Sequence, residues 1–195
     1  MTFAPGPLQP FRGAKATVWA SRIVYRMDIA LRSPDASRLN QPEEDFVAAL
    51  EKGITPNSAG YRDKSWNILG QVYFPKAVTD STFAFETNSE PGQFVPVHVH
   101  PTQDEFILVQ EGVLDLKLDG VWVQAKAGDL VRLPRGIPHG YLNKSDKPAR
   151  ALFWVSPMQK LEALFDKLHN LTDPAEVVRI SADHEVDFLP PEANA

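Results

Sequence analysis

From Trp66 to Val155 the chain consists of short runs rich in β-branched and aromatic residues, and turn residues separate these runs every eight to twelve positions. Val113–Leu118 alternates between apolar and charged residues, and successive side chains on a strand point to opposite faces. Asp119-Gly120 directly after it is a strong hairpin signal. Inward positions would be Leu114, Leu116 and Leu118, and outward positions Asp115 and Lys117. The pattern predicts a mainly all-β fold, an antiparallel jelly-roll barrel.

Helical spacing of apolar residues follows the β region. Ser156 is expected to cap a helix with an apolar stripe, and Thr172 or Asp173 to start a second helix that runs through Ile180. Residues 181–195 are expected to be extended or disordered. The stripe consists of Leu161, Leu164, Phe165 and Leu168. The predicted strands are Trp66–Phe74, Thr79–Thr87, Phe94–His100, Asp104–Gln110, Val113–Leu118, Val121–Ala125, Leu130–Leu133, Ile137–Leu142 and Arg150–Val155.

The first 65 residues differ from the β region. Residues 1–13 contain several prolines and glycines and predict an irregular arm, whereas Thr17–Leu31 favours a strand through its Val, Ile, Tyr and Trp residues. Pro42 to Gly53 predicts a short helix, with proline at the first position and acidic residues in the first turn. The predicted organisation is an N-terminal arm with a strand and a short helix over residues 1–65, a barrel over 66–156, and C-terminal helices and a tail over 157–195.

The composition excludes several classes of function. The chain has no cysteine, which rules out disulfides, thiolate metal ligands and cysteine nucleophiles. Its net charge of −5 argues against a general nucleic-acid binder. No apolar run approaches the roughly 18 residues of a membrane span, and the first residues do not resemble a secretory signal. We therefore expect a cytoplasmic protein that binds neither nucleic acid nor membrane.

Three of the five histidines fall in one stretch together with a glutamate. His98 and His100 are two residues apart in a predicted strand, so both imidazoles project from the same face. Glu105 follows, and His139 lies in a later predicted strand. Three imidazoles and one carboxylate suit a divalent transition metal. The remaining histidines, His169 and His184, are expected to lie at the surface.

Two motifs around these residues resemble those of the cupin superfamily. The first has a Gly, five residues, His-x-His, a Glu, six residues and a Gly. The second has a Gly, five residues, Pro-x-Gly, two residues, a His, three residues and an Asn. Both are complete here and consist of Gly92, His98, His100, Glu105 and Gly112, and of Gly128, Pro134, Gly136, His139 and Asn143. Within the superfamily the chain looks most like single-domain cupins related to quercetin 2,3-dioxygenase.

The resemblance implies a metal-dependent dioxygenase that cleaves a small enol, flavonol-like or aromatic substrate with O₂. His98, His100, Glu105 and His139 would hold one divalent ion per chain, with Fe(II) favoured and Mn, Ni, Co or Zn as alternatives. Glu105 could also act as the catalytic base that takes the proton of the substrate hydroxyl. Two alternatives use the same barrel: a non-oxidative isomerase, decarboxylase or lyase, and a binding module that captures a small ligand without changing it.

Alternation along the strands predicts which residues share the face of the ligands. We expect a largely apolar substrate pocket in which Tyr141 is the one additional polar group. Asp104 should point away from it, and Arg132 and Arg135 are expected to be ordinary surface charges. The predicted pocket residues are Phe83, Phe85, Phe94, Ile107, Val109, Ile137 and Tyr141. Because uncovered jelly-roll edges tend to pair, a homodimer is expected.

Overall fold

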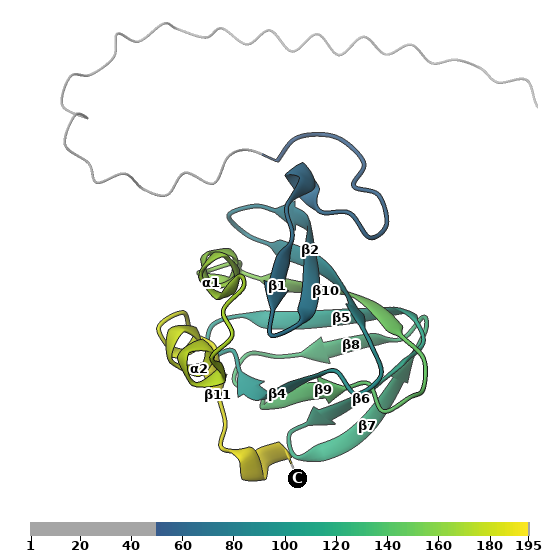
Figure 1. Ribbon diagram of the computed structural model, residues 1–195, viewed down its shortest axis with the longest axis vertical. Coiled ribbons are helices and arrows are strands. Elements are labelled where there is room, and N and C mark those ends of the chain that lie inside the picture. Colours follow the sequence, from purple (N-terminus) through teal and green to yellow (C-terminus); the bar gives the residue numbers. More distant parts are fainter. Residues whose placement is uncertain (1–49, 195) are drawn as a thin grey trace, which may run out of the picture. The chain divides into compact units, whose positions relative to one another are not determined.

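The computed structural model describes residues 50–194. They form two antiparallel sheets with two short helices beside them, as Figure 1 shows, which confirms the predicted fold class. The strands are β1 (Trp66–Ile68), β2 (Gln71–Val78), β3 (Phe83–Ser89), β4 (Phe94–Val99), β5 (Asp104–Glu111), β6 (Val113–Leu118), β7 (Val121–Lys126), β8 (Leu130–Leu133), β9 (His139–Leu142), β10 (Ala149–Ser156) and β11 (Asp187–Phe188). The helices are α1 (Leu161–Leu168) and α2 (Pro174–Ala182), and two short 3-10 turns cover Tyr61–Asp63 and Pro191–Asn194.

The strand order brings distant parts of the sequence together. One sheet has six strands in the order β1-β2-β3-β10-β5-β8, and the other has five in the order β11-β4-β9-β6-β7. The sheets pack face to face, because the ring of Tyr141 in β9 lies 5.5 Å from that of Phe153 in β10. This arrangement makes β4, β5 and β9, which carry His98, Glu105 and His139, walls of one interior.

The first predicted strand, Trp66–Phe74, is wrong as a single element. The chain turns at Leu69 and Gly70, which have φ values of 50° and 88°, so that β1 and β2 form a hairpin. The side chain of Asn67 supports this turn by accepting a hydrogen bond from the Gly70 amide at 3.1 Å. Glycine readily adopts a positive φ, but leucine does not, so the sequence signals this turn only weakly.

An aromatic cluster fills one end of the space between the sheets. The Phe165 ring of α1 lies 5.4 Å from that of Trp66, 5.4 Å from Phe83 and 5.0 Å from Phe85. Trp66 and Phe83 are almost fully buried. Edge-on aromatic contacts of this kind stabilise a core beyond the area they bury. Phe165 therefore attaches α1 firmly to the six-stranded sheet.

The C-terminal helices match the predicted ones, although the predicted cap of the first is wrong. Ser156 belongs to β10, and α1 begins at Leu161 after Lys160. All four predicted stripe residues of α1 are buried. The second helix, α2, begins at Pro174, and its N-cap Asp173 accepts a hydrogen bond from the Ala175 amide at 3.0 Å.

The last part of the chain, predicted to be extended or disordered, is extended in β11, whereas residues 181–182 close α2 and Pro191–Asn194 form a 3-10 turn. Strand β11 pairs antiparallel with β4, so that Phe188 lies opposite His98. Asn194 extends this attachment, because its side-chain carbonyl accepts a hydrogen bond from the Val97 amide at 2.9 Å. The segment after β10 therefore adds an edge strand to the five-stranded sheet.

Two charged residues are buried, Lys117, which was predicted to face outward, and Glu86. Lys117 is 6% exposed, and its ammonium group lies 5.6 Å from the ring of Trp122, its cross-strand partner. Glu86 is 3% exposed on the outer face of the six-stranded sheet. It accepts hydrogen bonds from the Ser58 amide at 2.9 Å and from Arg150 at 3.3 Å.

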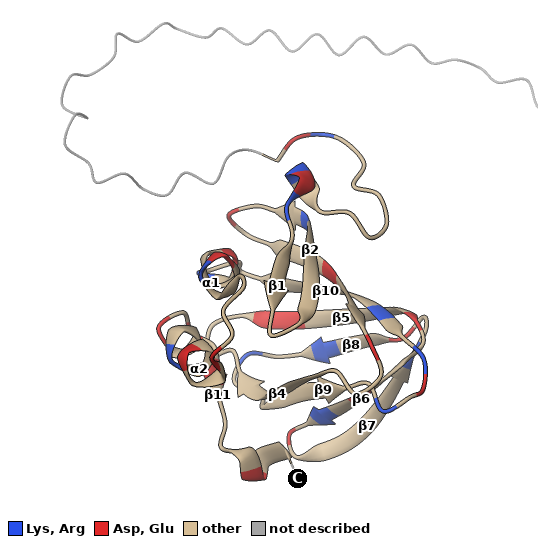
Figure 2. Ribbon diagram, in the orientation of Figure 1, with Lys and Arg blue, Asp and Glu red and all other residues tan. Residues whose placement is uncertain are grey.

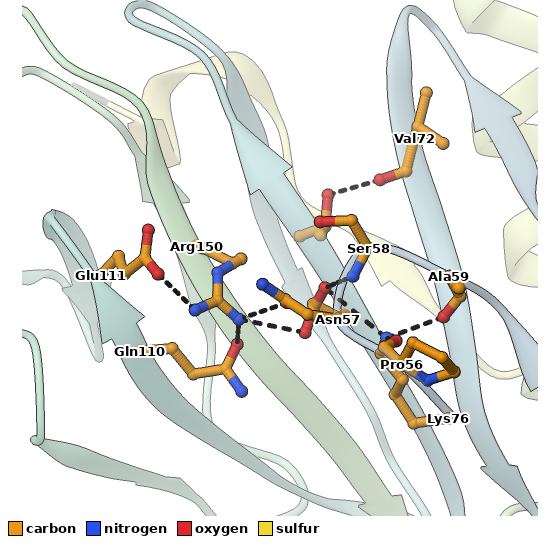
Figure 3. A network of polar contacts seen from close by, with 11 residues as sticks. Pro56, Asn57, Ser58, Ala59, Val72, Lys76, Gln110, Glu111 and Arg150 are labelled. Atoms are coloured by element: carbon orange, nitrogen blue, oxygen red, sulfur yellow. Dashed lines mark hydrogen bonds and ion pairs between the residues drawn. The ribbon is translucent and has the colours of Figure 1, made fainter. Parts of the chain in front are cut away.

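The Glu86 network holds the segment before β1 against the sheet, and Figure 3 labels the partners of Glu86, among them Ser58, Lys76 and Arg150. Arg150 also donates to Asn57 and Gln110 and pairs with Glu111. Lys76 donates to two backbone carbonyls of the same segment, those of Pro56 and Ala59. Paired charges of this kind explain how Glu86 remains buried.

Predictions for the first part of the chain fall mostly outside the described residues. This applies to the irregular arm at 1–13 and the strand Thr17–Leu31. The predicted helix from Pro42 to Gly53 also lies largely outside them, and its described end, residues 50–53, is not helical. The division at residues 65 and 156 stays a prediction. Among the described residues, no helix has the length and apolar character needed to cross a bilayer.

Candidate metal centre

Four side chains from three strands converge between the two sheets. His98 lies in β4 with His100 just after it, His139 lies opposite His98 in β9, and Glu105 comes from β5 of the other sheet. One potential ligand atom from each lies within 4.8 Å of all the others, and all four residues are buried. The two-residue spacing in β4 and the antiparallel pairing of β4 with β9 together place the imidazoles on one inner face.

The separations between the ligand atoms suit a single ion. The Nε2 atoms of His98 and His100 are 3.2 Å apart. Oε2 of Glu105 lies 3.1 Å from Nε2 of His100 and 3.2 Å from Nε2 of His139. Ligand atoms held about 2.0–2.2 Å from a common ion are roughly 3 Å from one another.

Each imidazole is oriented through its second nitrogen. Nδ1 of His98 lies 2.9 Å from the carbonyl oxygen of Pro96, and Nδ1 of His139 lies 2.8 Å from that of Ile137. Nδ1 of His100 lies 3.0 Å from Oε1 of Gln103. A carbonyl oxygen only accepts, so each Nδ1 carries the proton and each Nε2 presents a lone pair. Outer partners of this kind are typical of histidines that bind metals.

The electrostatics of the metal-free group point the same way. Burial lowers the pKa of His98 well below its ordinary value, and the nearby His139 and His100 lower it further. Burial by itself would raise the pKa of Glu105, but His100 and His139, which donate hydrogen bonds to it when doubly protonated, outweigh burial and lower the pKa. Burial opposes protonation of His139 too, yet Glu105 raises its pKa overall. The carboxylate therefore stays ionised and attracts positive charge.

The donor set fits a divalent transition metal better than it fits protons. With Nδ1 protonated, the His100 and His139 Nε2 atoms cannot donate to Glu105 unless the rings take a second proton. A divalent cation at the same point satisfies three lone pairs and the carboxylate at once. The four residues could thus hold a metal ion, as the sequence predicts, while the identity of the ion is not determined by these ligands.

A cavity of about 460 Å³ opens from the four ligands. Of the predicted pocket residues, Phe85, Phe94, Ile107 and Tyr141 line it. The other three do not. Phe83 packs against Trp66 and Phe165, and Val109 lies four residues along β5 from Glu105, about 13 Å away. Ile137 precedes β9, so strand alternation does not apply to it.

Several lining residues were not predicted. Gln71 of β2 lies in the wall and donates to the Tyr141 hydroxyl at 2.6 Å. Ser181 of α2 also lines the cavity, and its hydroxyl is the one buried side-chain polar atom without a hydrogen-bond partner among residues 50–194. Phe188 of β11 packs against the His98 ring with a centroid distance of 5.4 Å. The amphipathic pattern of the C-terminal helices indicated that they pack against the sheets, but nothing in the sequence indicated that they line the cavity.

Tyr141 is the predicted polar group of the cavity, and burial raises its pKa to about 12. It therefore stays protonated, so that its hydroxyl can donate a hydrogen bond. Around it the lining is mainly apolar. Charged residues of both signs are interspersed elsewhere in the described region, whereas β4 and β9 carry none (Figure 2).

The other sequence expectations have mixed outcomes. His169 is exposed, as expected, and its Nδ1 accepts a hydrogen bond from the Asn67 amide. His184 is only 7% exposed, and its Nδ1 lies 2.8 Å from the Ile180 carbonyl oxygen, so the surface prediction is wrong for this residue. Arg132 and Arg135 are exposed. Arg135 donates two hydrogen bonds to the Asp104 carboxylate.

Comparison with known proteins gives matches over the same region. A family model described as a cupin domain matches residues 85–155. The tetracenomycin polyketide synthase protein TcmJ of Streptomyces glaucescens is 32% identical over 116 residues, which are 59% of this chain and 77% of that protein. The polyketide synthase CurC of Streptomyces cyaneus is 35% identical over 68 residues, 35% of this chain and 44% of the relative.

Two further matches bear on the fold and on the chemistry. The quercetin 2,3-dioxygenase of Bacillus subtilis (strain 168) is 41% identical over 56 residues, which are 29% of this chain and 17% of that enzyme. The chain thus spans less than half of the dioxygenase and of CurC. A crystal structure of an RmlC-like cupin from Shewanella frigidimarina has a TM-score of 0.50 at 18% identity, covering 58% of this chain and 97% of the other.

The domain match, the two complete motifs and the similarity to TcmJ over most of its length agree with one another. The resemblance inferred from the sequence is thereby confirmed, and the chain belongs to the cupin family.

Proposed function

We propose that this cupin is a metal-dependent enzyme for a small, mainly apolar enol or phenol, and that its reaction is a dioxygenation. One observation carries the proposal: three imidazole Nε2 atoms and one carboxylate oxygen converge at the wall of a cavity of about 460 Å³. A ligand set open to a cavity is typical of a catalytic rather than a structural ion.

His98, His100, Glu105 and His139 would hold one divalent ion, and we propose Fe(II) as the favoured one. Such an ion would supply Lewis-acid activation of an enol or phenol oxygen and, if redox-active, access to O₂. Imidazole and carboxylate ligands also accept Mn, Ni, Co and Zn, so the choice of ion needs elemental analysis.

The chain's own residues supply proton acceptance, orientation and exclusion of water. Glu105 remains ionised because His100 and His139 lower its pKa, and its carboxylate would be basic enough to take a substrate proton because a bound ion would lower the pKa of the hydroxyl. The apolar walls formed by Phe85, Ile107 and Phe153 would keep water from the reacting oxygen. Similarity to a protein named quercetin 2,3-dioxygenase supports a flavonol-like substrate.

Oxygen uptake by the metal-loaded protein tests this proposal. Protein reconstituted with Fe(II), Mn(II), Ni(II) or Co(II) is offered flavonols, 1,3-diketones and catechols, and products are identified by mass spectrometry. We expect stoichiometric O₂ consumption that disappears in His139→Ala and in Glu105→Gln. No uptake with any metal and substrate pair would refute the dioxygenase assignment.

A non-oxidative reaction is the second candidate, and the names of two relatives favour it. TcmJ and CurC are both described as polyketide synthase proteins, and polyketide chains are rich in enolisable carbonyl groups. The same ligands and Glu105 would then serve an isomerase, decarboxylase or lyase. Turnover under strict anaerobiosis would establish this candidate and displace the first. Binding without turnover that survives His98→Ala would instead indicate a non-catalytic ligand-binding cupin.

The predictions of a homodimer and of a cytoplasmic location also remain proposals. An exposed strand edge supports the dimer, because β7 is the last strand of its sheet and its residues Val121, Trp122 and Val123 are 62%, 40% and 41% exposed. Light scattering should give twice the chain mass of 21.7 kDa, and the monomer mass would contradict the proposal.

A further inference from the structure

A cluster of polar side chains lies in the wall of the otherwise apolar cavity. Its centre is the Gln71 side-chain amide, whose nitrogen lies 2.6 Å from the Tyr141 hydroxyl. The same nitrogen lies 3.1 Å from the hydroxyl oxygens of Thr87 and Ser89. Tyr73 donates its hydroxyl proton to Oε1 of Gln71 at 3.2 Å. All five residues are buried, and three of them, Gln71, Tyr73 and Tyr141, line the cavity.

The hydrogen bonds of this cluster orient the Tyr141 hydroxyl. Tyr73 donates to Oε1 of Gln71, and the nitrogen of the same amide donates to the Tyr141 hydroxyl. These two hydrogen bonds hold the amide in one orientation. Thr87 uses its own proton on the Val72 carbonyl oxygen at 2.8 Å. Tyr141 accepts from Gln71 and also interacts with the Ser89 and Tyr73 hydroxyls, so its own proton is either shared with these two or donated to a ligand oxygen. An oxygen of a bound molecule can take that proton because Tyr141 lies in the cavity wall.

The position of Tyr141 relative to the metal ligands sets where that oxygen would lie. Tyr141 follows His139 by two residues in β9, so the two side chains leave the same face of the strand about 6.6 Å apart. Five buried polar groups cost more free energy at this point than apolar side chains of similar size would, unless each is well paired. A cavity with one metal-binding end and one hydrogen-bond donor in its wall is suited to a ligand with two separate oxygen functions.

We propose that Tyr141, oriented by Gln71, is a positioning residue that hydrogen-bonds a second oxygen of the substrate while the first oxygen lies at the metal ligands. The inference rests on the proposed function and narrows its substrate class to rigid, mainly apolar molecules with two spaced oxygen groups. A carbonyl or phenolic oxygen serves as the acceptor for Tyr141. A substrate without the second oxygen would bind at the metal but would lose its fixed orientation.

Ligand binding to the Zn²⁺-loaded protein tests the proposal without oxidation. The probes are 3-hydroxyflavone, which has no oxygen beyond its chelating pair and ring oxygen, and its 3,7- and 3,4′-dihydroxy analogues. Tyr141→Phe removes one hydroxyl and keeps the ring, and Gln71→Leu removes the orienting amide. Tyr61→Phe is the matched control, because Tyr61 does not line the cavity and its hydroxyl contacts only surface groups, the exposed Glu51 amide and Arg62.

We expect at least one dihydroxy analogue to bind wild type more tightly than 3-hydroxyflavone does. Tyr141→Phe should weaken that analogue roughly 3- to 10-fold and leave 3-hydroxyflavone within about twofold. Gln71→Leu should act in the same direction, and Tyr61→Phe should have no effect.

Three results would overturn the proposal: equal weakening of all the probes by Tyr141→Phe, no effect on any of them, or no binding of any probe to wild type. Failure of the proposed function would give results different from these three. Binding that persists after chelation would refute the metal's role, and absent turnover would refute the reaction, while the selective effect of Tyr141→Phe would still stand.

Discussion

Gln103 offers the sharpest test of how the metal centre is built. It is 1% exposed, and its amide nitrogen donates to the backbone carbonyls of Pro157 and Met158. With its nitrogen committed in this way, its Oε1 must face Nδ1 of His100, which lies 3.0 Å away. Gln103 therefore determines both the orientation of the His100 ring and the nitrogen that carries its proton.

Gln103→Met keeps the length of the side chain and removes all three hydrogen bonds. Loss of such an outer partner typically lowers metal affinity 10- to 100-fold, which corresponds to about 1.4–2.8 kcal/mol of binding free energy. The carbonyl oxygens of Pro157 and Met158 also lose this donor, although that of Met158 keeps the Leu161 amide at 3.3 Å, so the metal-free protein should lose roughly 1–3 kcal/mol of unfolding free energy.

Co²⁺ titration by calorimetry, with a chelator as competitor, measures the affinity change, and thermal unfolding measures the stability change. Gln124→Met is the matched control, because Gln124 lies exposed in β7 and makes one long contact of 3.4 Å with Asp115. A folded Gln103→Met protein that binds Co²⁺ within twofold of wild type would refute the reasoning. No Co²⁺ binding by wild type would instead refute the metal centre itself.

Four further changes test other parts of the structure. Gly140→Ala would place a Cβ atom 2.8 Å from the Val95 oxygen and 2.9 Å from the Val97 nitrogen, so it should push β9 away from β4 and lower the affinity for Co²⁺. Gly53→Ala is the control, because its Cβ would have no atom within 4 Å, and it should leave the Co²⁺ affinity unchanged. Phe165→Ala should cost about 3–5 kcal/mol of unfolding free energy in urea titrations, because its ring contacts four aromatic rings. Val178→Ala, on the exposed side of α2, should cost little, and equal losses would contradict the placement of Phe165 in the core. Glu86→Gln leaves Lys76 and Arg150 without their shared carboxylate and should cost roughly 1–3 kcal/mol by the same measurement, more than Glu51→Gln in an exposed pair. Arg135 lowers the pKa of Asp104 to about 2 in the folded protein. Because the folded pKa is lower than the unfolded one, the ion pair stabilises the protein above about pH 4, and this stabilisation is lost as the pH falls towards about 2. The difference in melting temperature between wild type and Asp104→Asn should therefore shrink from about pH 4 to about pH 2, and a constant difference would contradict the pairing.

Local patterns predicted the elements of the barrel because they depend on neighbouring residues only. Val113–Leu118 alternates and forms β6, and Asp119-Gly120 forms the turn into β7. The two motifs predicted that His98, His100, Glu105 and His139 form one site. The antiparallel pairing of β4 with β9 brings the imidazoles together, and β5 of the facing sheet adds Glu105. Features that depend only on the alternation of side chains along one strand could therefore be predicted from the sequence.

Long-range packing decided what the sequence could not predict. Strand β11 has two residues, and it exists because β4, almost ninety positions earlier, offers a free edge. Alternation predicted the inward face of Val109 but not its depth along β5, which carries it past the cavity. Lys117 is buried because Trp122 faces it from the neighbouring strand, a pairing that depends on register.

The cover of the cavity comes from a different part of the chain than the metal ligands. The ligands belong to strands within residues 98–139, whereas Leu164, Ser181 and Phe188 enter the lining from the segment after β10. Substitutions in this segment can therefore change the shape of the cavity while the four candidate ligands stay the same. For the engineer, a library at Leu164 and Ser181 would change the cavity wall without touching the four candidate ligands, whereas Phe188 should be kept because its ring packs against His98.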